Sequence, residues 1–364
     1  VMHEGSIVEE ATVAELIQSP QHPHTKALLS AIPEYNVANG RLPTTARPPG
    51  WETKQAPSPT INDAYNRRQS FGVQADKTAF PRPPSTPTEP TGWPADTPSH
   101  SPGSAIVEAT GICKEFRHAA HRTIALDGVS LAVQEGECLS LVGESGCGKT
   151  TLARILVGVE QPDSGEIRIC GLNTQAAKLS VRQRVGRLCQ MVFQNPYASL
   201  NPRLRVHKII EEPLLIHWTG DRQRRSRRVK QLAKTVRLPT DCLELFPHQL
   251  SGGQRQRVAI ARALALSPKV IIADEPVSAL DVSVQARILE LLDELRETLG
   301  LTLVLVSHNL QVVRWISDRV AVMYSGQIVE HGTTDDIFNR PQHSYTQLLL
   351  NSAPRLGAPL SSDR

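Results

Sequence analysis

Apolar and polar residues follow three patterns along the chain, and the pattern changes near residues 33 and 105. Residues 1–33 combine short apolar runs with polar turns, which predicts a strand and two short helices. Residues 34–104 show no apolar period and are rich in Pro, Thr and Ser, as in PRPPSTPTEPTGWPADTPSHSPGS. Such a segment cannot bury a core, so it predicts a flexible, semi-extended linker. From residue 105 to 340, β-branched runs alternate with helical segments, which predicts an α/β domain with a tail over 341–364.

Individual elements of this domain can be assigned from their period. The segments AIVEATGI, LSLVGE, KVIIADEP and LTLVLVSH are apolar and β-branched, and they predict strands. TLARILVGV predicts a helix directly after the second of these strands. VQARILELLDELRETLG places its apolar residues at helical spacing, and RVAVMYSGQIVEHG predicts a closing hairpin.

One segment of about 32 residues occurs twice. MHEGSIVEEATVAELIQSPQHPHTKALLSAIP, from Met2, aligns without gaps on MYSGQIVEHGTTDDIFNRPQHSYTQLLLNSAP, from Met323. The second copy closes the α/β domain. We therefore expect residues 1–33 to be the remnant of the end of a preceding domain of the same kind. Without the sheet to which it belongs, the strand IVEE would have no partner within this remnant, and we expect disorder or weak docking.

Composition narrows the class of protein. The chain has 364 residues, 40% hydrophobic and 21% charged, with a formal net charge of +4, as in soluble globular proteins. No run approaches the ~18 apolar residues of a membrane span, and no leader pattern opens the chain, which favours the cytoplasm. The six cysteines form no C-x-x-C pair, which predicts reduced, isolated thiols. The basic run at Arg222–Arg228 favours a solvated helix face over a nucleic-acid patch, because no aromatic residues are interleaved with it.

The strongest chemical motif is GESGCGKTT, between a predicted strand and a predicted helix. It satisfies G-x-x-x-x-G-K-[ST], whose backbone N–H groups and helix N-terminus cradle phosphates. Lys149 would bind the terminal phosphates, and the Thr150 hydroxyl is placed for Mg²⁺. Cys147 either is a small residue at a tolerant position or blocks ATP when it is alkylated. The ATP-binding candidates are Gly143, Glu144, Ser145, Gly146, Cys147, Gly148, Lys149, Thr150 and Thr151.

The strand KVIIADEP supplies acidic groups to the same kind of site. Asp274 ends the strand, where ligands of parallel sheets bind, and its carboxylate suits Mg²⁺ or a Mg²⁺-bound water. Glu275 follows at once and could polarise an attacking water as general base.

A second anion-binding helix start follows in LSGGQRQRVAIARALA, with Ser251 as the predicted N-cap. One mononucleotide needs one phosphate cradle, so the second start predicts contact with a nucleotide bound by another domain. The sequence therefore predicts a head-to-tail dimer with composite sites. The residues assigned to the partner's ATP are Leu250, Ser251, Gly252, Gly253 and Gln254.

The phosphate loop, LSGGQ, KVIIADEP, SALD and LVSH, in this order, resemble the nucleotide-binding subunits of ABC transporters. The resemblance covers about residues 105–354. It implies a P-loop NTPase fold with a RecA-like core, an antiparallel β subdomain and an α-helical signature subdomain. It also implies that Gln194 senses Mg²⁺ and contacts the permease, that Asp281 lies at the dimer seam, and that His308 contacts the γ-phosphate. Phe116 would stack on adenine, although a core position remains the alternative. The implied catalytic set is Glu275, His308 and Gln194, and the Mg²⁺ set is Thr150, Gln194 and Asp274.

Two further stretches, FQNPYASLNPR and PQHSYTQLLLNSAP, resemble the oligopeptide/dipeptide importer branch, with its nickel and glutathione relatives. Many relatives carry an iron–sulfur cysteine cluster after this tail. Neither RLPTTARPPGW nor LGAPLSSDR contains a cysteine, so we expect no such cluster.

The resemblance implies an ATPase that uses ATP and Mg²⁺ and energises an importer for di/oligopeptides or related small solutes. Its partners would be a second ABC domain (self, a sister subunit or a fused upstream domain), transmembrane permease subunits and, indirectly, an extracytoplasmic solute-binding protein. It would lie peripherally at the cytoplasmic face of the cell membrane and bind no nucleic acid. The alternative is a soluble tandem ABC ATPase acting on ribosomes or DNA. A P-loop kinase does not explain LSGGQ.

Overall fold

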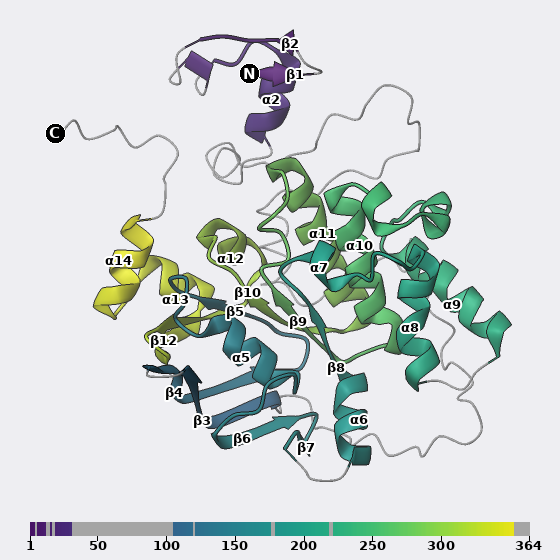
Figure 1. Ribbon diagram of the computed structural model, residues 1–364. Coiled ribbons are helices and arrows are strands. Elements are labelled where there is room, and N and C mark those ends of the chain that lie inside the picture. The colour runs from purple at the N-terminus through teal and green to yellow at the C-terminus, as the bar shows by residue number, and fades with distance from the viewer. Residues whose placement is uncertain are drawn as a thin grey trace, which may run out of the picture. The chain divides into compact units, whose positions relative to one another are not determined.

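The computed structural model describes residues 1–3, 6–11, 15–16, 19–30, 105–118, 121–175, 179–217 and 221–352 (Figure 1). The predicted linker over 34–104 and the two stretches considered for an iron–sulfur cluster lie outside the described residues. Contacts divide the chain into two units, Val1–Asp96 with Arg355–Arg364 and Thr97–Pro354. Each unit is described by itself.

The larger unit is organised around a six-stranded sheet of order β12-β11-β5-β10-β9-β8. All neighbouring strands are parallel except β11 and β12, which form the predicted closing hairpin. Every residue of β5, β9 and β10 is buried, as expected for apolar strands covered on both faces. The strands are β5 (Cys138–Val142), β8 (Cys189–Val192), β9 (Val270–Asp274), β10 (Thr302–Val306), β11 (Arg319–Tyr324) and β12 (Gln327–Thr333).

Successive residues of these strands enter two different cores, because side chains alternate between the faces of a sheet. In β9, Ile271 and Ala273 pack into the core formed with the helical part of the domain. Val270 and Ile272 pack into the core formed with the second sheet. The sheet is therefore held from both faces, and the carboxyl ends of its parallel strands meet at one edge.

The second sheet is antiparallel, with the order β4-β3-β6-β7. Its first strand is longer than predicted, because it pairs with β4 along nearly its whole length and continues past the predicted segment AIVEATGI. The strands are β3 (Ala105–His118), β4 (His121–Gln134), β6 (Ser164–Ile169) and β7 (Leu172–Asn173).

The helical part flanks the central strands separately from the antiparallel sheet (Figure 1). It contains α7 (Pro196–Ser199), α8 (Val206–His217), α9 (Arg222–Thr235), α10 (Gly252–Ala263) and the 3₁₀ turns Thr240–Glu244, Pro247–Gln249 and Leu264–Leu266. The basic run forms the predicted helix α9, which exposes Arg222, Arg224 and Arg227. Arg225 instead pairs with the buried Glu211, at 3.1 Å. The predicted α/β fold, with its β subdomain and helical subdomain, is confirmed.

The remaining helices are α5 (Lys149–Leu156), α6 (Leu179–Leu188), α11 (Val282–Leu299), α12 (Leu310–Ile316), α13 (Thr334–Asn339) and α14 (Ser344–Ser352). In α11 the predicted apolar stripe is buried except at its last residue, Leu299. All six cysteines are free thiols, and only Cys113 is not fully buried. None of the helices in the described part of the chain combines the length and apolarity that a bilayer span requires.

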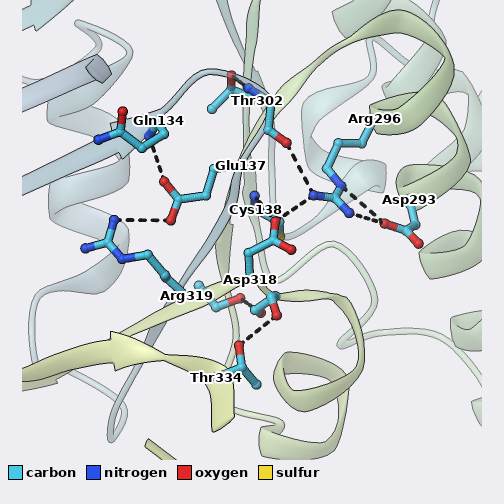
Figure 2. Close-up of polar contacts among 12 residues, drawn as sticks. Gln134, Glu137, Cys138, Asp293, Arg296, Thr302, Asp318, Arg319 and Thr334 are labelled. Atoms are coloured by element: carbon cyan, nitrogen blue, oxygen red, sulfur yellow. Dashed lines mark hydrogen bonds and ion pairs between the residues drawn. The ribbon is translucent and has the colours of Figure 1, made fainter. Parts of the chain in front are cut away.

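A polar cluster joins α11 to the amino ends of the central strands (Figure 2). The Arg296 side chain is 9% exposed and pairs with Asp293 at 2.9 Å and with Asp318 at 2.6 Å. Beside it, Arg319 donates to Glu137 at 3.2 Å. These ion pairs fix the edge of the sheet opposite to the edge where the parallel strands end.

The N-terminal unit contains β1 (Met2–His3), β2 (Ser6–Ile7) and α2 (Pro23–Ser30). The expectation that the remnant strand has no partner of its own was wrong, because β2 pairs with β1 in an antiparallel hairpin. Met2 is the partner of Ile7, just as Met323 is the partner of Ile328 in the second copy. The repeat of the sequence is therefore also a repeat of strand register.

Local contacts are repeated as well. The Glu9 carboxylate accepts the backbone N–H groups of Gln21 at 2.7 Å and His22 at 3.0 Å. At the matching positions, Glu330 accepts those of Gln342 and His343 at the same two distances, 2.7 and 3.0 Å. Both copies thus use one glutamate to fix the turn before their final helix.

Candidate functional site

The predicted phosphate loop connects β5 to α5 and depends on glycine at two positions. Gly143 has φ +146°, and a Cβ there would lie 2.1 Å from the carbonyl oxygen of Met323. Gly148 has φ +106°, and its Cβ would lie 2.3 Å from the carbonyl oxygen of Ala125. Only glycine avoids both the unfavourable φ and these backbone contacts. The loop is therefore wrapped closely by neighbouring strands.

Lys149 places its ammonium group inside this loop. Its Nζ donates to the carbonyl oxygens of Gly143 at 2.8 Å and Glu144 at 2.7 Å, and it lies 3.5 Å from Cys147 Sγ. The residue is only 5% exposed. A positive charge at the N-terminus of α5, beside the backbone N–H groups of the loop, is the arrangement that binds phosphate.

Thr150 and Asp274 meet where a divalent cation would be held. The Thr150 hydroxyl donates to Asp274 Oδ1 at 3.1 Å, and Asp274 is 2% exposed. Burial raises the pKa of Asp274, and the hydrogen bond from Thr150 opposes this shift. A buried carboxylate beside a hydroxyl is an oxygen donor pair that fits Mg²⁺. Lys149, Thr150 and Asp274 thus lie at the same edge of the sheet.

Glu275 lies between two polar side chains from neighbouring strand ends. Its Oε1 is 2.9 Å from His308 Nδ1, and its Oε2 accepts Gln194 Nε2 at 2.8 Å. The backbone of Glu275 has φ +45°, and its N–H donates to Val306 of β10 at 2.9 Å. A non-glycine residue at positive φ persists only where its surroundings enforce it. The structure brings the three predicted catalytic residues into direct contact.

The signature segment is separate from this cluster. Ser251 caps α10 and forms a capping box with Gln254, whose N–H donates to Ser251 Oγ at 3.3 Å. The next two residues, Gly252 and Gly253, lie against the segment that leads into α11 and against its first turn. Among the described residues, no hydrogen bond joins the signature to the phosphate loop. The two anion-binding helix starts therefore belong to different places in one cassette, as the composite-site hypothesis requires.

The two remaining candidates are exposed or half-buried. Asp281 is exposed at the N-terminus of α11. Phe116 is half-buried in β3, outside the buried core clusters, and the Lys114 ammonium lies 5.4 Å from its ring centroid. This placement weakens the core alternative for Phe116, and adenine stacking stays a prediction.

The sequence did not indicate two contacts that hold the loop from outside. Glu144 N–H donates to the Tyr345 hydroxyl of α14 at 3.0 Å. Gly326 N–H, in the β11–β12 turn, donates to the Cys147 carbonyl oxygen at 3.1 Å. Tyr345 lies in the tail motif PQHSYTQLLLNSAP, which indicates an importer branch but no contact with the loop.

Fold and site together define a cassette that binds ATP, and comparison with known proteins agrees. The family model described as "ABC transporter" matches residues 126–278. The model described as "Oligopeptide/dipeptide transporter, C-terminal region" matches residues 8–57 and 329–364, which include parts of both copies of the repeat. The chain belongs to the family of ABC transporter ATP-binding proteins.

Within this family, the chain is similar to ATP-binding proteins that are named for dipeptide transport and glutathione import. The chain is 52% identical over 237 residues to the dipeptide transport ATP-binding protein DppF of Escherichia coli, covering 64% of this chain and 70% of that protein. It is 41% identical over 361 residues to the glutathione import ATP-binding protein GsiA of Pectobacterium atrosepticum. That match covers 97% of this chain but only 53% of GsiA, so the chain spans about half the length of this relative.

Solved structures show the same fold. The dimeric post-hydrolysis structure of the ATP-binding cassette MJ0796, bound to ADP and Pi, matches with a TM-score of 0.58 and 33% identity. The match covers 63% of this chain and 99% of that chain.

Proposed function

We propose that this chain is an ATP-hydrolysing subunit that energises an importer for di/oligopeptides or related small solutes. The observation that carries the proposal is the convergence of Lys149, Thr150, Asp274 and Glu275 at one edge of the sheet. The glutamate carboxylate is held there by its two neighbours from the ends of β8 and β10. A strained backbone at Glu275 and a buried Asp274 whose pKa is raised by burial are features that a purely structural strand end does not need.

The chemistry follows from these positions. Lys149 and the loop N–H groups would bind and orient the β- and γ-phosphates, and Thr150 and Asp274, with Gln194, would hold Mg²⁺. Bound Mg²⁺ would supply charge neutralisation at the phosphate oxygens. Glu275 would accept a proton from the attacking water as general base, while His308 contacts the γ-phosphate.

The site is completed by a second cassette. The signature residues of one domain would bind the γ-phosphate of the ATP on its partner, so that each site uses both domains. The separation of Ser251 from the phosphate loop supports this arrangement, and so does the dimeric state of the structural relative. The partner would be a copy of the chain, a sister subunit or a fused upstream domain.

The N-terminal unit would be the end of such an upstream domain. Its strand register and the contacts of Glu9 repeat those of the closing hairpin and of Glu330. The test is the intact mass of the native polypeptide from its own cells. A mass well above that of this chain supports a fused tandem, and a mass equal to that of this chain contradicts it.

The permease would dock beside Gln194. A groove of about 730 Å³ is lined there by Gln194, Phe193, Glu212, Ile216 and Arg262, among others. Ile216 is 70% exposed, an apolar side chain without cover. A transmembrane helix end seated in this groove would touch the residue that also binds Glu275. The subunit would then lie at the cytoplasmic face of the membrane, with a solute-binding protein acting through the permease.

Substitution Glu275→Gln tests the proposal. The amide retains the size of the side chain but cannot accept the proton, so hydrolysis should fall by about 100-fold or more while ATP binding persists. ATP-dependent dimers should then accumulate on a sizing column. Glu297→Gln, on the exposed part of α11, is the matched control and should leave both readouts unchanged. Hydrolysis at the wild-type rate in Glu275→Gln would refute the assignment.

The alternative, a soluble tandem ABC ATPase acting on ribosomes or DNA, is not supported, because the relatives are named for transport or import. Fractionation of native cells separates the two proposals. Recovery with membranes supports the importer subunit, and recovery with ribosomes contradicts it.

A further inference from the structure

One peptide group of the phosphate loop is held at both of its polar atoms. The peptide between Gly143 and Glu144 offers its carbonyl oxygen to Lys149 Nζ at 2.8 Å. Its N–H donates to the Tyr345 hydroxyl at 3.0 Å. Rotation of this peptide would break both bonds together. The orientation of the group that binds the Lys149 ammonium therefore depends on a side chain from the C-terminal tail.

Tyr345 is itself fixed by two contacts of its own, and one of them is supported by a further hydrogen bond. Its ring packs against Tyr324, with centroids 4.3 Å apart, and the residue is 7% exposed. Its backbone N–H donates to His343 Nδ1 at 3.1 Å. His343 N–H in turn donates to the Glu330 carboxylate at 3.0 Å. The hydroxyl thus reaches the loop from a rigid support built on β11 and β12.

The β11–β12 hairpin also contacts the phosphate loop directly, so the same hairpin supports both the tail and the loop. The Met323 carbonyl oxygen lies 2.1 Å from the position that a Cβ of Gly143 would take. Gly326 N–H donates to the Cys147 carbonyl oxygen at 3.1 Å. A support that is already in place costs little ordering entropy when the loop closes around phosphates.

We propose that Tyr345 is a positioning residue for the phosphate loop, and that it raises the affinity of this cassette for ATP. It acts through the Gly143–Glu144 peptide, which keeps the Lys149 ammonium at the centre of the loop. The proposal rests on the function proposed above, since it concerns the same nucleotide site. It assigns a role in nucleotide binding to the tail, which lies outside the motifs that define the cassette.

Substitution Tyr345→Phe in the full chain removes only the hydroxyl. Loss of this partly buried hydrogen bond should weaken MgATP binding by about three- to tenfold. The KM for ATP should rise by the same factor, and kcat at saturating ATP should stay within about twofold, because the contact orders the loop before the transition state. Tyr324→Phe is the matched control, since it removes the hydroxyl of the adjacent ring and should leave the ATP affinity within about twofold.

A purely structural role gives a different result. Tyr345→Phe would then lower the melting temperature while the KM for ATP stayed at the wild-type value, and this outcome would overturn the proposal. If the variant melts below the assay temperature, amide hydrogen exchange on the wild-type chain decides. Glu144 is an exposed residue, yet its backbone N–H should exchange slowly because it donates to the Tyr345 hydroxyl. Exchange at the rate of an unprotected amide would overturn the proposal.

A parallel MgATP titration of the wild-type chain distinguishes failure of this inference from failure of the proposed function on which it rests. Absence of ATP binding by the wild type would reject both. Wild-type binding together with equal affinity in Tyr345→Phe would reject only the role of Tyr345.

Discussion

Asp274 shows how a single residue of the site trades stability for function. It is 2% exposed, and burial raises its pKa above the ordinary value. Near neutral pH an ionised carboxylate at this depth costs folding free energy, because the lost hydration outweighs the attraction of the nearby Arg154 and Lys149 charges. Retaining such a group is reasonable for a Mg²⁺ ligand.

Substitution Asp274→Asn should therefore stabilise the nucleotide-free chain by on the order of 1 kcal/mol at pH 7. The amide oxygen can still accept the Thr150 hydroxyl. A carboxyl whose pKa is raised on folding costs stability above its folded pKa, and this cost disappears as the pH falls toward its unfolded pKa of about 3.9. Urea unfolding should show a gain at pH 7 that shrinks toward pH 4. A variant that is less stable than the wild type at pH 7 would contradict this account.

At the residue scale, the sequence indicated which residues form the site better than it indicated which of them contact one another. The motif predicts that Lys149, Asp274 and Glu275 lie near one another, because each follows or ends a parallel strand. It does not predict that Gln194 and His308 bind opposite oxygens of one carboxylate. It also missed the Tyr345 hydroxyl, because that contact joins residues 201 positions apart. Such bonds depend on how the elements pack, which no local pattern encodes.

At the scale of elements, the sequence predicted the apolar strands and the long helix, since burial on both faces or on one stripe leaves a clear pattern. It did not predict the extent of those strands whose ends depend on pairing with another strand. The first strand runs to His118 because β4 pairs with it, and Ser6–Ile7 is a strand because Met2–His3 lies beside it. The polar cluster of Figure 2 was also not predicted, because its members come from α11 and from the residues at the starts of β5 and β11.

That cluster should contribute strongly to stability. Arg296→Leu would remove the guanidinium shared by Asp293 and Asp318 and leave both carboxylates without this partner, so unfolding free energy should fall by about 2–4 kcal/mol. Arg227→Leu, at an exposed position of α9, should change it by less than about 0.5 kcal/mol. Denaturant titration of both variants measures the difference. Equal stability of the two variants would show that the cluster contributes little.

At the scale of the whole molecule, the proposed composite sites make a prediction about mixtures of two variants. Lys149→Ala should lose ATP binding at its own loop but keep an intact signature, and Ser251→Arg should do the reverse. Neither variant alone should hydrolyse ATP. An equal mixture should recover about a quarter of wild-type activity, because half of the random dimers contain one complete site. No recovery would exclude pairing between two copies of this chain.

The repeated turn has a consequence for the timing of ATP turnover in the proposed tandem protein. Both copies keep the glutamate and histidine that support the final helix, but His24 stands where the second copy has Tyr345. An upstream cassette that ends in this segment would hold its own loop without the phenolic hydroxyl. Nucleotide would then dwell for unequal times in the two halves, and the order in which the halves release ADP would be set by one aromatic residue in each tail.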